Sequence, residues 1–426
     1  MEKKQNSNVL AIIVMILLFG MISFVTNLAS PMGDILKNQF QVANWMGTLG
    51  VLANFIAYAV MGIPAGNMLQ KYGYKKTALV AVGVGFAGVG IQTIAGLLTG
   101  MTAFGVYLLG AFVAGFSMCM LNIVVNPMLN KLGGGGNKGN QLIQVGGSFN
   151  SLMGTACIFL TGVLIPNGIK NAVISDVFPL MYLALGIFAL AFVIIALSAI
   201  PEPHMETAEE KAARLSGTAK KDPHGPMSFR HFVLGAIAIF FYVGVEVGIP
   251  NTANIYMSGL EGVGPAIAGT VVGFYWFCMM LGRLFGGAVG AKVSSKTMLT
   301  VSCSLALVFV GCIMFIPETV KMTVPVVNAQ VPVSMVFMFL CGLCTSVMFG
   351  SIFNLATEGL GKYTPVASGI FMAMICGGGI MPFIQGLVAD AAGFINSYWV
   401  VVAGLAYMLF YGLFFSKNVN KDIPVE

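Results

Sequence analysis

The stretch that decides the fold is VLAIIVMILLFGMISFV, residues 9–25, an apolar run without a single charge. A second such run, ALGIFALAFVIIALSAI, covers residues 184–200. Both are apolar around a whole helix rather than along one face, which is typical of segments in lipid. The short alternating segments of an outer-membrane barrel are not seen. The two runs therefore predict membrane-spanning α-helices.

The composition of the whole chain extends this prediction to the rest of the protein. Of its 426 residues, 58% are hydrophobic and 8% are charged, with a mean hydropathy of +0.90. A soluble domain carries roughly a quarter charged residues. So few polar side chains cannot cover a surface that faces water, so a soluble fold is excluded and the partner is the lipid bilayer. We expect an all-α membrane protein.

Apolar runs separated by loop signals divide the chain into twelve transmembrane helices, each close to the roughly 20 residues that cross a bilayer. The first run is longer than the apolar region of a signal peptide and has no A-x-A-like cleavage site, so we expect it to be retained. The predicted spans are approximately 9–37, 44–70, 77–99, 102–130, 141–166, 177–200, 230–258, 265–291, 297–316, 332–360, 364–390 and 395–416.

Basic residues predict how the spans are oriented, because cytoplasmic loops carry an excess of Lys and Arg. If both termini are cytoplasmic, all of the 21 basic residues except Lys37, Lys170 and Lys321 lie on the cytoplasmic side. We predict a multi-pass protein of the plasma (inner) membrane. The hydrophilic stretch 201–229 is interpreted as a solvated cytoplasmic linker between two pseudo-symmetric six-helix bundles, 1–200 and 230–426.

The two halves resemble each other in sequence. GNMLQKYGYKK at 66–76 is echoed by GGAVGAKVSSK at 286–296. In the first span of each half a polar residue precedes a proline by four, at Asn27 and Pro31 and at Glu246 and Pro250. Proline leaves the carbonyl four residues back without its helical donor, and such a group at membrane depth must line a cavity or be covered by protein. We expect both spans to bend beside a central cavity in a duplicated unit typical of secondary transporters.

Two of the 15 acidic residues are not explained by a place in a loop or at the end of a predicted span. A charge at the bilayer centre costs at least about 2.5–3.5 kcal/mol and marks a transport pathway by default. Glu246 lies about sixteen residues after Arg230, roughly 24 Å along the helix at 1.5 Å per residue. Its alternative role is a structural hydrogen bond. Asp34 lies in the outer half of the first span, where a salt bridge with Lys37 is the alternative. Arg283, at a span end, is expected to snorkel or pair at the interface.

A polar stripe runs along the fifth span. Its members are spaced three or four apart and so share one helix face: Gln141, Gln144, Ser148, Ser151 and Thr155. Hydrogen bonding between helices and a cavity wall for a polyhydroxylated ligand explain the stripe equally well. Tyr275 could add an aromatic platform for a sugar ring. The candidate substrate-binding residues are Asn27, Asn122, Gln144, Asn150, Asn251, Asn254, Tyr275 and Asn354.

Other classes of function find no support. All eight cysteines lie in apolar segments, where they act as small hydrophobes, and no cluster has the spacing of a metal site. No HExxH, P-loop or aspartate-rich motif is present, so we expect neither an enzyme nor a cofactor. No basic patch with interleaved aromatics predicts binding to nucleic acid.

Several motifs of the chain resemble those of a known family. The loop after the second span is similar to the G-x-x-x-D-R-x-G-R-R/K signature of the major facilitator superfamily, with Gln70 in place of the aspartate. MGDILKNQF at 32–40, FNS at 149–151 and FYVGVEV at 241–247 resemble motifs of the fucose permease-like sugar:proton symporters, the last in its glucose/galactose form. The resemblance implies conformational gating by Gly66, Lys71, Gly73, Lys75, Lys76 and Arg283.

Two positions depart from the fucose permease pattern. Its membrane glutamate falls on Asn122, and a sugar-facing glutamine is replaced by Gly147, whereas its essential aspartate falls on Asp34. We therefore hypothesise a monomeric importer of a hexose, deoxyhexose or amino sugar that works by alternating access, with Asp34 and Glu246 binding the coupling proton. Sodium-coupled or uncoupled sugar transport and a proton-coupled efflux antiporter are the alternatives.

Overall fold

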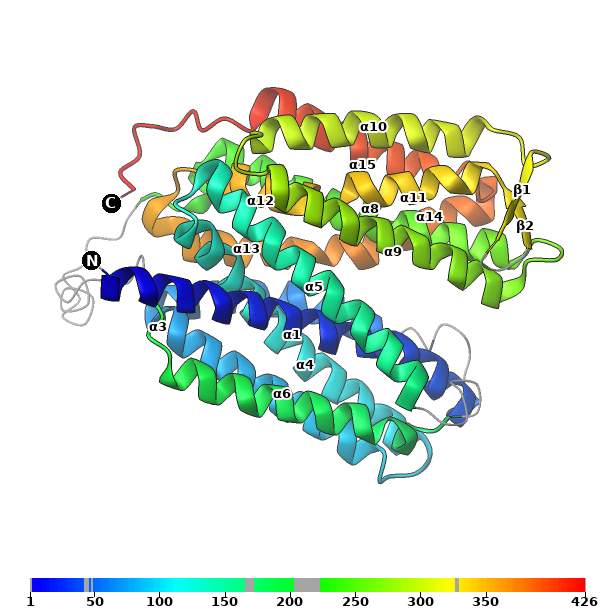
Figure 1. The fold of residues 1–426 in the computed structure, drawn as a ribbon, viewed down its shortest axis with the longest axis horizontal. Coiled ribbons are helices and arrows are strands. Elements are labelled where there is room, and N and C mark those ends of the chain that lie inside the picture. Colours follow the sequence, from blue (N-terminus) through cyan, green and yellow to red (C-terminus); the bar gives the residue numbers. More distant parts are fainter. Residues whose placement is uncertain are drawn as a thin grey trace.

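The computed structural model describes residues 2–41, 46, 49–164, 172–202, 223–325 and 329–425. Long helices dominate it, as the apolar runs predict. The N-terminal half forms the lower part of Figure 1. Its helices are α1 (Glu2–Phe40), α3 (Leu49–Ala95), α4 (Gly100–Leu132), α5 (Gly136–Leu164), the 3-10 turn η2 (Ile174–Val177) and α6 (Phe178–Leu197).

The C-terminal half forms the upper part of Figure 1 and contains more interruptions. It starts with the 3-10 turn η3 (Pro226–Ser228), and a π-helix, η6 (Tyr411–Phe415), ends its last span. The helices between them are α8 (Arg230–Ser258), α9 (Gly264–Val289), α10 (Ser295–Phe315), α11 (Ser334–Thr345), α12 (Met348–Thr357), α13 (Thr364–Ala373), α14 (Gly377–Ala392) and α15 (Tyr398–Phe410), with 3-10 turns η4 (Gly361–Tyr363) and η5 (Met374–Cys376).

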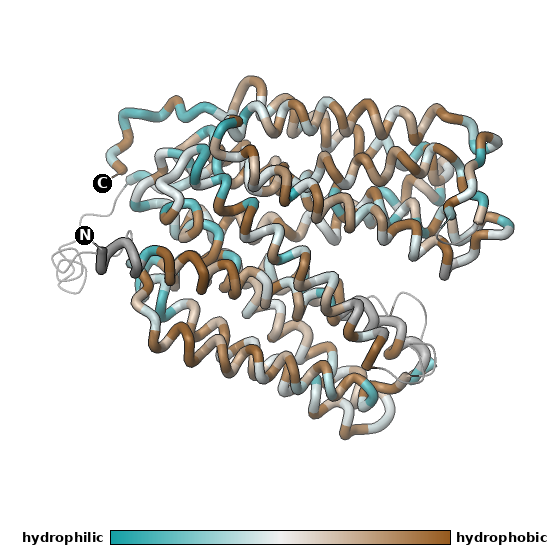
Figure 2. The backbone as a smooth tube through the Cα atoms, viewed as in Figure 1, coloured by the Kyte–Doolittle hydropathy of each residue, from teal (hydrophilic) through white to brown (hydrophobic). Residues whose placement is uncertain are grey.

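The described residues account for the twelve predicted crossings. Ten segments are long and apolar enough to cross a membrane. One of them, α3, is two predicted spans joined at Gly73, whose φ of 83° breaks the helix within 47 residues. The remaining crossing is α5. Figure 2 shows hydrophobic residues along the length of the helices and hydrophilic residues mostly toward the two ends, as a lipid environment requires.

One feature differs from the sequence prediction. A two-stranded antiparallel hairpin, β1 (Lys321–Val324) and β2 (Ala329–Pro332), follows α10 where we expected a loop. Helices α1 and α8 are continuous through Pro31 and Pro250, and the bends expected there stay a prediction. The predicted linker 201–229 falls largely on residues outside the described ranges, so the domain boundaries stay a prediction.

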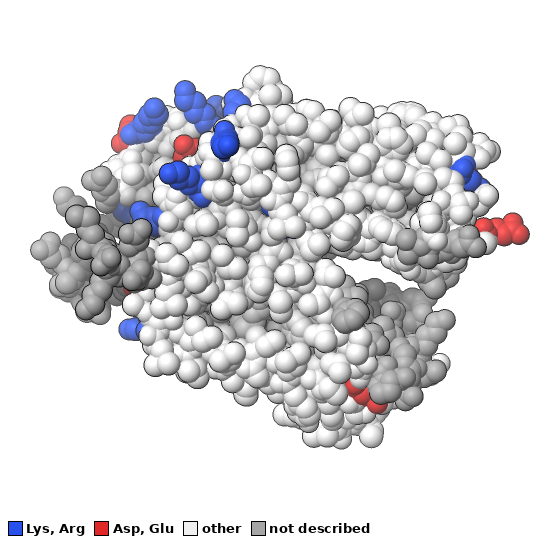
Figure 3. All heavy atoms as spheres, in the orientation of Figure 1, with Lys and Arg blue, Asp and Glu red and all other residues white. Residues whose placement is uncertain are grey.

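Both termini lie at the same end of the molecule (Figure 1). At this end the two halves are in close backbone contact through α3 and α13. A Cβ atom at Gly62 would lie 2.6 Å from the carbonyl oxygen of Gly369, and one at Gly66 would lie 2.9 Å from the Cα of Gly369. At the opposite end Figure 3 shows a notch whose upper wall belongs to the C-terminal half.

Candidate functional site

The centre of the candidate site is an ion pair between Glu246 of α8 and Arg283 of α9. The Nη2 of Arg283 lies 3.3 Å from Oε1 of Glu246, and each side chain is 15% exposed. Here the structure corrects the sequence expectation for Arg283. Its guanidinium does not snorkel to the interface at a span end, because the side chain points into the protein and pairs with Glu246.

Arg283 also contacts the N-terminal half. Its Nη1 donates to the hydroxyl of Ser151 at 2.8 Å and to the carbonyl of Gly147 at 3.3 Å, both on α5. The side-chain oxygen of Asn150 is 3.5 Å away. Arg283 therefore joins three helices and bridges the two halves, since its planar fork of donors serves several acceptors at once.

Tyr275 bonds to the main chain of α8 at Glu246, and its ring is not open to a ligand. Its side chain is fully buried, and its hydroxyl lies 3.0 Å from the main-chain carbonyl of Glu246 and 3.0 Å from the hydroxyl of Thr345. That carbonyl is the group that Pro250 leaves without a helical donor. The expected bare carbonyl is thus covered by protein, and Tyr275 is no sugar platform in this structure.

The other predicted polar residues of the N-terminal half bond mainly to their own bundle. Asn122 donates to the hydroxyl of Tyr58 at 2.8 Å. Asn27 donates to the carbonyl of Ser23 at 2.8 Å, one turn earlier in α1. Asn150 donates to the carbonyl of Phe19 at 2.7 Å, which ties α5 to α1. Tyr58 was not singled out from sequence, since a lone tyrosine in an apolar run carries no distinguishing signal.

Two of the predicted substrate-binding amides lie on α8 beyond Glu246. Asn251 is exposed, and the buried side-chain oxygen of Asn254 has no hydrogen-bond partner in the described part of the chain. Buried polar atoms are normally paired, so the Asn254 oxygen is suited to accept a hydrogen bond from a ligand. Both residues lie on α8 one to two turns beyond Glu246.

Toward the end that carries the termini, amides hold the halves together. Gln144 donates to the carbonyl of Val347 at 3.0 Å, and Gln141 donates to the carbonyl of Gly287 at 2.9 Å. Asn130 donates to the side-chain oxygen of Asn354 at 2.9 Å. This part of the polar stripe therefore bonds helix to helix, and Gln144 and Asn354 act here as a latch between the halves rather than as cavity wall.

The predicted gating loop lies at the same end. Gly73 adopts its positive φ, and Gly66 packs against α13. Lys75 donates through Nζ to the carbonyls of Ala196 and Ser198 at 2.8 and 2.9 Å. Lys71 lies over the ring of Tyr72, and Lys76 is exposed.

A carboxylate that sequence reasoning passed over completes this loop. Glu202, just after α6, accepts hydrogen bonds from the main-chain N–H groups of Tyr74 and Lys75 at 2.5 and 2.9 Å. These groups begin the helix that restarts after Gly73, where a negative charge is favoured. The sequence around Glu202, in the predicted linker 201–229, carries no signal of this contact.

Asp34 lies within α1, but its side chain is outside the described part of the structure. Its role stays a prediction. Within the described ranges, no group of three His, Cys, Asp or Glu residues could hold a metal ion.

Comparison with known proteins agrees with this architecture. The model of the Major Facilitator Superfamily matches residues 10–381. A glucose/galactose transporter of Brucella abortus biovar 1 (strain 9-941) is 31% identical over 408 residues, covering 94% of this chain and 93% of that protein. The L-fucose-proton symporter of Escherichia coli (strain K12) is 23% identical, covering 87% of this chain and 85% of that protein.

A solved structure shares the fold. The crystal structure of the major facilitator superfamily transporter FucP in the outward conformation aligns with a TM-score of 0.79 at 20% identity, covering 97% of this chain and 100% of that one. The chain belongs to the major facilitator superfamily. It is a multi-pass membrane transporter of the twelve-helix fold and not an enzyme, as the sequence predicts.

Proposed function

We propose that this protein imports a monosaccharide by proton symport. The observation that carries the proposal is the buried pair of Glu246 and Arg283, placed where α8, α9 and α5 meet. The curated relatives, which are named as glucose/galactose and L-fucose-proton transporters, support a sugar as substrate and a proton as the coupling ion.

A proton on Glu246 would change how Arg283 holds the two halves together. The charged carboxylate attracts the guanidinium across 3.3 Å. Protonation removes that attraction and leaves Arg283 to its contacts with Ser151 and Gly147 of the other half. Proton binding on one half therefore alters a contact between the halves, which is what coupling to alternating access requires.

The sugar would bind next to this pair. Asn251 and Asn254 on α8 offer amide groups from the C-terminal half, and Asn150 and Ser151 lie beside Arg283 on the N-terminal half. Amides and hydroxyls both donate and accept hydrogen bonds, as a polyhydroxylated ligand requires. Asp34 is proposed as a second proton-binding carboxylate because it matches the family motif MGDILKNQF.

We assign both termini to the cytoplasm because that end carries most of the basic side chains (Figure 3). The contacts between α3 and α13 then close the cytoplasmic end, and the notch faces outward. On this assignment the conformation is the one that accepts sugar from outside, in a monomer of the plasma membrane.

The decisive experiment is uptake by the purified protein in proteoliposomes. A panel of labelled hexoses, deoxyhexoses and N-acetylhexosamines is tested under an imposed pH gradient, a sodium gradient and no gradient. We expect saturable uptake of at least one monosaccharide, with accumulation above equilibrium driven by the pH gradient. Accumulation under the sodium gradient alone would show that sodium, and not the proton, is the coupling ion. Absence of saturable uptake of any sugar would refute sugar transport.

The proton-binding residues are tested in the same vesicles. Glu246→Gln and Asp34→Asn are compared with Glu261→Gln, which changes an exposed carboxyl group outside the site. We expect the first two variants to retain downhill exchange but to lose accumulation driven by pH, and Glu261→Gln to behave as wild type. If Glu246→Gln and Asp34→Asn still accumulate sugar, neither carboxyl group carries the coupling proton.

A further inference from the structure

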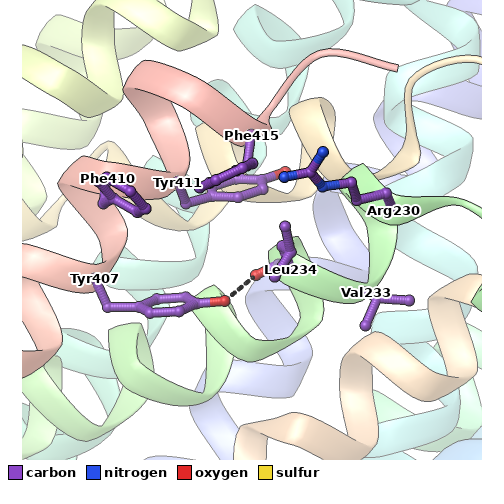
Figure 4. A pocket seen from close by; sticks show the side chains of 7 residues that line it. All are labelled: Arg230, Val233, Leu234, Tyr407, Phe410, Tyr411 and Phe415. Atoms are coloured by element: carbon purple, nitrogen blue, oxygen red, sulfur yellow. Dashed lines mark hydrogen bonds between the residues drawn. The ribbon is translucent and has the colours of Figure 1, made fainter. Parts of the chain in front are cut away.

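An apolar cavity of about 430 Å³ lies between α8 and the last helix of the chain, away from the ion pair. Figure 4 shows its walls: Arg230 and Phe415 close one end, and Tyr407 lies at the other. The lining is completed by Val233, Leu234, Phe410 and Tyr411. The cavity is large enough for part of an acyl chain, and its lining is apolar except for Arg230 and the tyrosine hydroxyls.

The two tyrosine hydroxyls already make hydrogen bonds within the protein. Tyr407 donates to the carbonyl of Leu234 at 3.1 Å, and Tyr411 donates to the carbonyl of His231 at 3.2 Å. These two bonds fix α15 and η6 against α8 while the space between them stays open. The π-helical turn η6 widens the end of the helix beside this space, a distortion common at functional sites.

Arg230 supplies a positive charge at the mouth of the cavity. Its guanidinium lies 4.4 Å from the ring centroid of Phe415. In the described ranges no carboxylate lies within ion-pair distance of it. Arg230 is also the first residue of α8, the end of a helix that carries a partial positive charge.

Further basic residues surround this corner. Lys296 donates to the carbonyl of Leu413 in η6 at 2.9 Å, and the main-chain N–H of Arg230 donates to Asn420 at 3.1 Å. The last contact draws the C-terminal tail, with Lys417 and Lys421, toward Arg230. Phe410 and Phe414 next to the cavity are 51% and 65% exposed, as expected of side chains that face hydrocarbon.

We propose that this cavity binds an anionic phospholipid from the leaflet on the side of the termini. Its phosphate would lie on the guanidinium of Arg230, which suits phosphate because it donates two hydrogen bonds in parallel. One acyl chain would enter the space between Leu234 and Tyr407. Positive charge at the mouth and an apolar interior match the two parts of such a lipid.

The test uses the full-length protein in neutral detergent and native mass spectrometry. Phosphatidylglycerol and phosphatidylcholine with identical acyl chains are titrated against wild type, Arg230→Gln, Val233→Phe and Lys292→Gln. Lys292 is an exposed basic residue at the same end of the molecule but outside the cavity, which makes it the matched control. All proteins are first shown to elute alike on size exclusion.

We expect wild type and Lys292→Gln to bind one phosphatidylglycerol in preference to phosphatidylcholine. Arg230→Gln should weaken the binding of phosphatidylglycerol about fivefold, the effect of one interfacial cation, and abolish the preference. Val233→Phe should weaken it by filling the cavity without any change of charge. Equal losses in Arg230→Gln and Lys292→Gln, unchanged binding in Val233→Phe, or displacement of the lipid by millimolar inorganic phosphate would each overturn the proposal.

Discussion

Arg283 contacts acceptors on both halves of the protein. It bonds to Glu246 on its own half and to Ser151 and Gly147 across the interface. Removing one member of a buried ion pair costs about 3–5 kcal/mol because the other charge is left uncompensated, whereas removing both is much less costly. The two side chains should therefore behave as a unit.

The first prediction concerns this coupling. Arg283→Gln should lower the melting temperature of the purified protein strongly, because Glu246 then remains buried without a cation. The double variant Glu246→Gln/Arg283→Gln should recover much of the lost stability. Thermal unfolding followed by tryptophan fluorescence measures wild type, Glu246→Gln, Arg283→Gln and the double variant, the four proteins of a double-mutant cycle. Additive effects in that cycle would show that the pair is not coupled.

Gly147 gives a second prediction at this scale. A Cβ atom there would lie 3.5 Å from Cδ of Arg283, an ordinary contact, so Gly147→Ala should transport as wild type. A longer side chain, as in Gly147→Gln, would occupy the space through which Arg283 reaches Ser151. Loss of a hydrogen bond to a charged group costs about 1.5–3 kcal/mol, so we expect uptake to fall by roughly tenfold or more. Equal uptake by the two variants would contradict this role for Gly147.

At the scale of elements, α3 and α13 form a close backbone contact between the halves. Gly62 and Gly66 face Gly369 with no room for a side chain between them. Small residues at such crossings let helices approach closely in a membrane. This approach is one of the contacts that join the halves at the end that carries the termini.

Gly62→Val should therefore open that end. The matched control is Gly83→Val in the second span of α3, where a Cβ atom would meet nothing within 4 Å. Spin labels on cysteines introduced at Lys138 and Lys292, one on each half, report the separation by pulsed electron resonance. We expect a longer mean distance in Gly62→Val and an unchanged one in Gly83→Val. A wild-type distance in both would mean that another contact keeps this end closed.

The apolar runs predicted the helices well because burial in lipid requires long uninterrupted segments. The apolar runs did not predict features that depend on local backbone geometry or on contacts between distant residues. The hairpin at 321–332 has no strong turn signal, and the first N–H groups of the helix after Gly73 bond to Glu202, which is more than a hundred residues away. Helix α8 is continuous through Pro250, and the carbonyl that this proline frees accepts a hydrogen bond from Tyr275 of α9, a contact that only the packing of the two helices reveals.

At the scale of the whole molecule, the two ends differ in chemistry. Basic side chains gather at the end that carries the termini, and the hairpin of β1 and β2 lies at the other (Figures 1 and 3). The count of Lys and Arg residues in the predicted loops identified this difference between the two ends, because it requires no knowledge of the tertiary structure. It could not place Arg283, since only the packing of α9 against α8 and α5 brings that side chain to Glu246.

The orientation is tested by labelling intact cells. Thr323→Cys in the exposed hairpin should react with a membrane-impermeant maleimide, whereas Lys138→Cys should react only after permeabilisation. Protein without an introduced cysteine gives the background from the native thiols, which are buried or half-buried. The reverse pattern would place the termini outside and invert the direction that we propose for import.

In the hydrogen bonds that Gln141 and Gln144 make between the halves, the N-terminal half supplies side chains and the C-terminal half supplies only main-chain carbonyls. This matters when halves of related proteins are recombined. Gln141 and Gln144 of α5 bond to the main-chain carbonyls of Gly287 and Val347, groups that every residue type supplies. A C-terminal half taken from a distant homologue would still present these acceptors if its helices kept the same path. Domain-exchange chimeras should therefore assemble while the N-terminal amides are kept, and residue matching would matter mainly at Asn354, Arg283 and Gly369.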